Sequence, residues 1–181
     1  MPLLEILTRC YRRPRMLAAN MASMAVQTDP DWVQTLLPDW EGRGVGWSFG
    51  NLAAYAPRVV GEYIWVLDDD DLCMRPTLVA ELRTLVAGWP GVVMVRMDHG
   101  PSGILPNRLA WGDCQNLTVG GVGVSAPIVR ADLWQAHAWA YGEHYAGDFD
   151  FLAALLATQP TVVWHDVVAS RVQRISAGEP E

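Results

Sequence analysis

The sequence contains no lysine, because all thirteen of its basic residues are arginine. Several kinds of catalysis depend on the lysine amine: P-loop phosphate binding, Schiff-base and pyridoxal chemistry, and general-base catalysis by lysine. The composition excludes all of these mechanisms. A GC-rich genome would produce the same arginine bias, so the absence excludes mechanisms and supports none.

Cysteine and long apolar runs are also scarce. The three cysteines, Cys10, Cys73 and Cys114, are widely spaced and odd in number. They predict a reducing, cytoplasmic location, with no disulfide framework and no thiolate metal site. No apolar run approaches the roughly 20 residues of a membrane span, and residues 1–5 lack a signal-peptide pattern. We therefore expect a cytoplasmic protein without a transmembrane segment.

Positive charge is in deficit, and the formal net charge is −7 at pH 7. A nucleic-acid-binding protein would need a basic face, so we expect no nucleic-acid partner. Apolar residues make up 51% of the 181 residues, enough to bury a sizeable core in one domain. We expect a single domain over residues 1–176 and a flexible tail at 177–181.

The order of apolar and polar segments predicts alternating strands and helices. Strands are expected at 3–7, 32–37, 63–67, 92–97 and 161–165, and helices at 14–27, 51–55, 77–87 and 149–157. Residues 98–118 form a long irregular stretch, and loops of that length are usually functional or mobile. The alternation is typical of an α/β domain with a mostly parallel sheet.

Four consecutive aspartates, Asp68 to Asp71, follow the apolar segment 63–67. That segment is typical of a strand buried on both faces, and ligands bind at the carboxyl ends of such strands. In extended backbone Asp68 and Asp70 would face the same way, and Asp69 and Asp71 would face away from them. Two carboxylates on one face, with no lysine to neutralise them, favour Mg²⁺ or Mn²⁺. Alternatively, Asp70 or Asp71 caps the helix that follows.

Two motifs carry a resemblance to a known family. The segments "EILTRCYRRP" (5–14) and "GEYIWVLDDDDLCMRP" (61–76) resemble the family 2 glycosyltransferases of the GT-A fold. That family opens with a strand and a Thr-x-Tyr-Asn-Arg-Pro-like turn, and a Gly-Glu-Tyr strand later leads into Leu-Asp-x-Asp-Asp. The resemblance covers most of residues 3–90. It implies an α/β fold that is a GT-A-like (Rossmann-like) three-layer sandwich with a mostly parallel central sheet.

The resemblance also implies a function. It implies a metal-dependent, inverting transfer of a sugar from a UDP- or GDP-type nucleoside-diphosphate sugar to a hydroxyl of a carbohydrate or other acceptor. The cofactor would be Mn²⁺ or Mg²⁺, bound by Asp70 and His165. The residues expected to bind the nucleotide sugar are Thr8, Arg9, Tyr11, Asp39, Asn51, Asp68, Asp69 and Arg171. Little chain follows the last strand, so a partner or a homo-oligomer would complete the acceptor site.

The second half of the chain resembles the family less closely. In "YAGDFDFLAALL" (145–156), Asp148 stands where the family places its catalytic carboxylate, but Gly147 replaces the preceding acid. We expect Asp148 to be the general base. Asp148 and Asp150 would equally suit a helix N-terminus, where the macrodipole favours negative charge. His165 is expected at the end of the last strand, although a lone histidine is often structural.

Two other classes of function stay open on the sequence alone. An aspartate-based phosphotransferase also uses Mg²⁺ and a strand ending in Asp-x-Asp, but that family normally places the motif on its first strand and needs a lysine. A catalytically inactive relative would bind a sugar nucleotide or glycan without turnover. Donor hydrolysis in the presence of Mn²⁺ would separate this relative from an enzyme.

Overall fold

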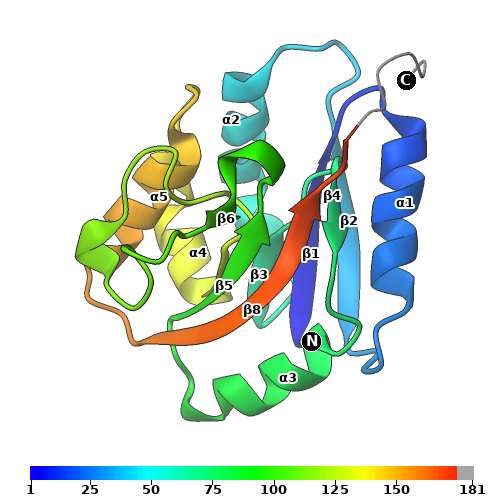
Figure 1. Cartoon of the computed structure of the whole chain (residues 1–181). Helices are drawn as coiled ribbons and strands as arrows, with labels where there is room; N and C mark the ends of the chain where they lie inside the picture. Colours follow the sequence, from blue (N-terminus) through cyan, green and yellow to red (C-terminus); the bar gives the residue numbers. More distant parts are fainter. Residues whose placement is uncertain (175–181) are drawn as a thin grey trace.

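The computed structural model describes residues 1–174, and the tail expected at 177–181 lies outside this range. The described residues form an eight-stranded sheet (Figure 1). Its strands are β1 (Leu4–Cys10), β2 (Trp32–Pro38), β3 (Tyr63–Val66), β4 (Asp71–Cys73), β5 (Val92–Asp98), β6 (Ile104–Leu105), β7 (Pro127–Arg130) and β8 (Val162–Val172).

Five α-helices accompany the sheet in the described range. They are α1 (Pro14–Ala25), α2 (Val45–Tyr55), α3 (Leu78–Leu85), α4 (Ala131–His137) and α5 (Gly147–Leu156). Proline stands in the first turn of α1, where its missing N–H costs nothing. A 3₁₀ turn at Ala138–Tyr141 links α4 to the segment before α5. None of the helices among these residues is both long and apolar enough to cross a membrane.

The sheet is mixed but mostly parallel, as predicted. Its strand order is β2-β1-β3-β7-β5-β8-β4, with β6 paired to β5. Strands β2, β1, β3, β5 and β8 run in one direction, and β7, β4 and β6 run against them. The carboxyl ends of β1, β2 and β3 therefore lie together at one edge, where the motifs of the N-terminal half meet.

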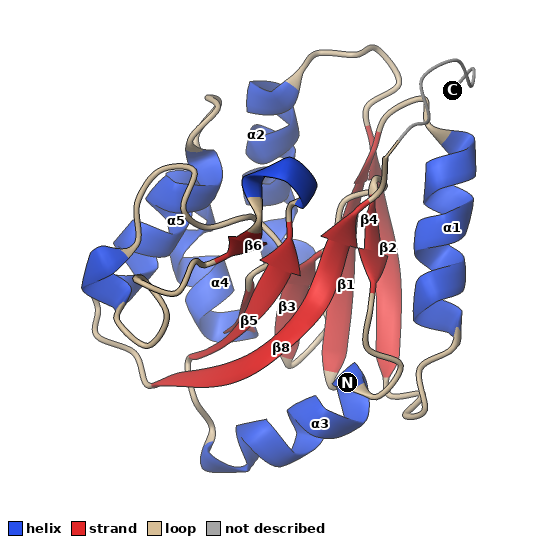
Figure 2. Cartoon of the chain, in the orientation of Figure 1, coloured by secondary structure: helices blue, strands red, loops and turns tan. Residues whose placement is uncertain are grey.

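The sheet lies between two layers of helices, so the fold is the expected three-layer α/β sandwich (Figure 2). One core packs α2, α4 and α5 against one face, with the aromatic side chains Phe49, Trp134, Tyr141 and Phe151 at its centre. The other core packs α1 and α3 against the opposite face, around Trp65. Alternate residues of β3 enter the two cores, as a strand buried on both sides requires.

The structure corrects three of the expected elements. The last strand extends beyond residue 165 to Val172, so His165 lies inside β8 and Arg171 lies near its end rather than in a loop. The aspartate run does not lead directly into a helix, because Asp71 begins the short strand β4, which pairs with β8. Helix α2 begins at Val45, six residues earlier than predicted.

Candidate active site

The aspartate run forms a tight turn between β3 and β4. The backbone N–H of Asp71 donates to the carbonyl of Asp68 (2.9 Å), which closes the turn. Gln173, just beyond β8, holds it from outside. Its backbone N–H donates to the carbonyl of Asp70 (2.6 Å), and its side-chain amide donates to the carbonyls of Met16 (3.0 Å) and Asp69 (3.1 Å). Gln173 therefore fixes the acidic turn and ties it to the start of α1.

Two arginines, Arg9 near the end of β1 and Arg13 immediately before α1, pair with this acidic turn. Arg9 makes a two-point contact with Asp68, from Nε to Oδ1 (2.7 Å) and from Nη2 to Oδ2 (2.5 Å). Arg13 uses its two terminal nitrogens on Asp69 (2.5 Å) and Asp70. Because β1 and β3 are parallel neighbours, their carboxyl ends bring these residues together. Arginines of this chain therefore supply the positive charge for three of the four adjacent carboxylates.

Two of the predicted binding residues hold loops in shape. The Asp69 side chain is 1% exposed and accepts a hydrogen bond from the backbone N–H of Tyr11 (2.9 Å). The buried carboxylate of Asp39 accepts three backbone N–H groups, those of Glu41 (3.1 Å), Gly42 (2.8 Å) and Arg43 (2.7 Å). It thereby folds the glycine-rich loop that leads to α2.

Thr8 is fully buried and belongs to an internal network. Its hydroxyl accepts a hydrogen bond from Gln34 (2.8 Å), whose amide also donates to Asn20 (2.7 Å). Asn20 in turn donates to the carbonyls of Asp68 (2.8 Å) and Asp71 (2.9 Å). Thr8 therefore supports the acidic turn from beneath.

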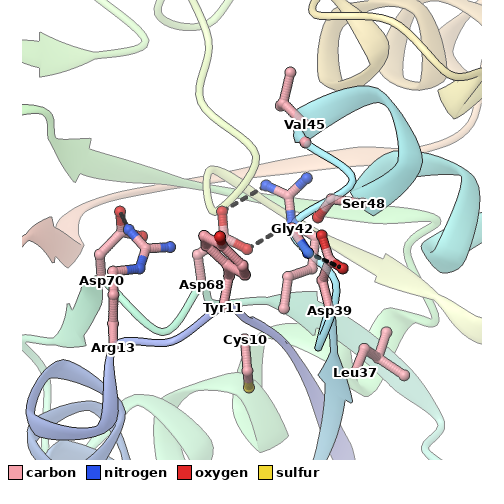
Figure 3. A pocket seen from close by; sticks show the side chains of 12 residues that line it. Cys10, Tyr11, Arg13, Leu37, Asp39, Gly42, Val45, Ser48, Asp68 and Asp70 are labelled. Carbon is pink, nitrogen blue, oxygen red and sulfur yellow. Dashed lines mark hydrogen bonds and ion pairs between the residues drawn. The ribbon is translucent and has the colours of Figure 1, made fainter.

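Two cavities lie beside this turn and share a wall. The first, of about 320 Å³, is lined by Tyr11, Asp39, Gly42 and the start of α2 (Figure 3). The second, of about 350 Å³, extends to Asp148 and to the loops around residues 99–105 and 119–124. The residues that line both cavities are Arg9, Val45, Asp68 and Asp70. An elongated ligand that filled both would cross this shared wall.

Asp148 lies in the first turn of α5 and lines the second cavity. Its carboxylate accepts a hydrogen bond from the backbone N–H of Phe149 (2.8 Å). Burial raises the pKa of Asp148 above its ordinary value, while that hydrogen bond and the charge of Arg9 act in the opposite direction. A carboxylate with a raised pKa at a cavity wall suits proton transfer.

Gly147 explains the departure from the family motif at this point. A Cβ atom on Gly147 would lie 2.2 Å from the carbonyl oxygen of Tyr141 and 2.9 Å from the Phe49 ring. The start of α5 packs so closely on the turn at 138–141 that no side chain fits. An acid before Asp148 is therefore sterically excluded in this chain.

Asp71 is a candidate that sequence reasoning missed. It was expected to face away from Asp68 and Asp70, yet it lines the second cavity with them. It is 2% exposed, and its Oδ2 has no hydrogen-bond partner among the described residues. Burial, followed by the charges of Asp68 and Asp70, raises the pKa of Asp71 well above its usual range. The tight turn breaks the alternation of an extended strand, and no sequence pattern signalled this.

Besides Thr8 and Asp69, three more predicted residues line neither of the two cavities. His165 Nε2 lies 2.7 Å from Glu81 Oε2, so its ring faces α3 instead of the acidic turn. Its position inside β8, and not at the strand's carboxyl end, accounts for this. Arg171 donates from Nε to Asp98 (2.8 Å) and lines a separate cavity with Arg174. Asn51, on α2, lines neither of the two cavities.

The oxygen donors present suit a hard divalent cation. Asp70 uses Oδ2 for Arg13 and is 31% exposed, and Asp71 Oδ2 lacks a hydrogen-bond partner within the part of the chain that the structure describes. Within residues 1–174, no group of three or more His, Cys, Asp or Glu side chains is arranged to hold a metal ion. Mg²⁺ and similar ions are commonly held by one or two carboxylates together with substrate phosphates. Asp70 and Asp71 fit that arrangement, and His165 does not take part in it.

Comparison with known proteins gives matches in structure alone. No family model and no curated protein matches the sequence. S. aureus TarS 1-349 in complex with UDP-GlcNAc matches with a TM-score of 0.71 at 11% identity, over 96% of this chain and 59% of that one. The mannosyltransferase PcManGT from Pyrobaculum calidifontis, in complex with GDP-Man and Mn²⁺, matches with a TM-score of 0.61 at 14% identity, over 98% of this chain and 58% of that one.

A third match is similar to this chain in length. A197 from STIV has a TM-score of 0.58 at 12% identity, and the match covers all of this chain and 98% of A197. By contrast, the chain spans 36–60% of the length of the TarS structures that it matches. The described residues thus have the GT-A-like α/β fold of structurally characterised glycosyltransferases.

Proposed function

We propose that this chain is a metal-dependent glycosyltransferase that moves a sugar from a nucleoside-diphosphate sugar to an acceptor hydroxyl, with inversion. The observation that carries the proposal is the pair of cavities joined at Arg9, Asp68 and Asp70, with Asp148 in the second. A nucleoside and a sugar linked by a diphosphate match two cavities with a charged junction. The structural similarity to proteins solved with UDP-GlcNAc and with GDP-Man and Mn²⁺ supports it.

The first cavity is assigned to the nucleoside. Tyr11 lines it and is 40% exposed, so its ring offers a flat apolar face to a base. Asp39 shapes the facing loop through its three backbone contacts and keeps a carboxylate at the cavity wall. Asp68 stands at the junction, within the same wall as Arg9. UDP and GDP are the nucleotides to be tested.

The second cavity is assigned to the sugar and the acceptor. Asp148 accepts the proton of the acceptor hydroxyl as that oxygen bonds to the anomeric carbon. The bond from the anomeric carbon to the diphosphate breaks in the same displacement, and attack from the opposite face inverts the configuration. Asp70 and Asp71 would hold the divalent cation, which supplies Lewis-acid stabilisation of the leaving diphosphate when bound.

Calorimetry with nucleoside diphosphates tests this function. UDP or GDP should bind the wild-type protein measurably with Mn²⁺ or Mg²⁺ and not with EDTA, because the cation that Asp70 and Asp71 would hold offsets the charge of the diphosphate. Asp70→Ala should remove the dependence on the metal. Asp132→Ala is the matched control, since it removes the same charge from a surface ion pair with Arg130. Equal affinity of the wild-type protein with and without EDTA would count against metal dependence.

A further inference from the structure

Arg9 is an unusually placed cation. Its side chain is 12% exposed and its guanidinium carbon lies 4.4 Å from the centre of the Phe49 ring. Nε and Nη2 are both used on Asp68, whereas Nη1 is buried and has no hydrogen-bond partner among the described residues. A buried donor without a partner is rare in folded proteins. Asp68 therefore fixes the guanidinium with one nitrogen uncommitted.

The amino-terminal end of α2 lies at the same wall. Gly44, Val45 and Ser48 line the first cavity, and Val45 lines both cavities. No side chain caps this helix and its first turn contains no acidic residue. The first backbone N–H groups of a helix have no partner within it and carry partial positive charge. This combination is the usual setting for a bound phosphate.

Arg13, the other arginine of the cavity, is less suited to an anion. Both of its terminal nitrogens contact carboxylates, those of Asp69 and Asp70. Only its Nε lacks a partner among the described residues. At the junction of the two cavities, Arg9 Nη1 and the start of α2 are therefore the donor groups that no carboxylate of the described residues engages.

We propose that Arg9 and the amino-terminal turn of α2 together form the binding site for the diphosphate of the donor. This inference rests on the proposed function, because the diphosphate of a nucleotide sugar lies between its nucleoside and its sugar. In this arrangement Asp68 acts as a positioning residue: it holds the guanidinium so that Nη1 meets a phosphate oxygen. Charge that builds up on the leaving group is then met by a fixed cation and a helix terminus.

Binding of a nucleoside diphosphate and of its nucleoside, both at saturating Mn²⁺, separates this role from a structural one. Arg9→Gln should lower the affinity for the nucleoside diphosphate by at least about tenfold, the loss typical of a charge-assisted hydrogen bond. The affinity for the nucleoside should stay within about threefold of the wild-type value. Arg15→Gln is the matched control. It removes the same charge from an exposed arginine of α1 that lines neither cavity, so it should leave both affinities unchanged.

A second pair of variants covers the case in which Arg9→Gln does not fold. Val45 is 46% exposed, so Val45→Asp adds a carboxylate to the first turn of α2 where a helix tolerates it well. The added charge should repel the diphosphate and weaken its binding by about tenfold or more. Val45→Asn introduces a side chain of nearly the same shape as aspartate but without the charge, so it should not weaken this binding. In both variants the nucleoside should bind as it does to the wild-type protein.

Two results would overturn the inference. If Arg9→Gln lowers the affinity for the nucleoside as much as the affinity for the nucleoside diphosphate, Arg9 only supports the acidic turn. If Val45→Asp binds the diphosphate as well as Val45→Asn does, the start of α2 is not part of the site. A wild-type protein that binds neither UDP nor GDP would instead refute the proposed function itself.

Discussion

Asp148 has the position and surroundings of a general base. It lines the second cavity at the start of α5, and burial raises its pKa. A base must be ionised to accept a proton, so the transfer rate should increase as the pH rises through the pKa of Asp148. The charge of Arg9 favours the ionised form and limits the shift. The raised pKa makes the ionised carboxylate of Asp148 a stronger base.

Asp148→Asn tests this role directly. The two side chains are nearly isosteric, and the Asn amide oxygen can accept the hydrogen bond of the Phe149 N–H, so fold and donor binding should be preserved. Transfer should fall by about 10²–10⁴-fold, the usual effect of losing a positioned acid or base. Steady-state kinetics and donor calorimetry on the same preparation separate the two effects. Near-normal turnover would exclude Asp148 and direct attention to Asp150 or Glu143.

Some residues of the candidate site were predictable and others were not. The sequence placed Asp68 and Asp70 at a strand's carboxyl end, and both line the two cavities. It did not predict that Arg9 and Arg13 would neutralise the acidic turn, because such ion pairs depend on the register of β1 against β3. The sequence analysis placed His165 at the end of the last strand, whereas it lies inside β8. A short apolar run does not show whether the strand ends there or continues.

At the level of elements, the close contact between α5 and the turn at 138–141 sets the position of Asp148. Strands β1, β2, β3 and β5 and helices α1, α3 and α5 were predicted within a few residues, because their apolar periodicity is local. The sequence analysis missed β4, β6, β7, α4 and the final part of β8. Strand β4 and the end of β8 pair with each other from segments about one hundred residues apart. Local patterns contain no information about such pairing.

Gly147→Ala tests the contact at the start of α5. The added Cβ atom meets the backbone carbonyl of Tyr141 at 2.2 Å, and backbone cannot move aside as a flexible side chain can. We expect a loss of about 1–3 kcal/mol of stability by chemical denaturation, together with reduced transfer as Asp148 is displaced. Gly88→Ala is the control, because nothing lies within 4 Å of its added Cβ. Equal stability of the two variants would contradict the close packing described for α5.

For the whole molecule, the central claim is that the two cavities hold one nucleotide sugar and that the site cleaves it. The most direct measurement is the release of nucleoside diphosphate from a panel of UDP- and GDP-sugars with Mn²⁺, which needs no knowledge of the acceptor because water can take its place. We predict release from sugars of one nucleotide class, lost with EDTA and strongly reduced in Asp148→Asn. Binding without release by the wild-type protein, from every donor of the panel, would contradict an enzyme and indicate a catalytically inactive relative.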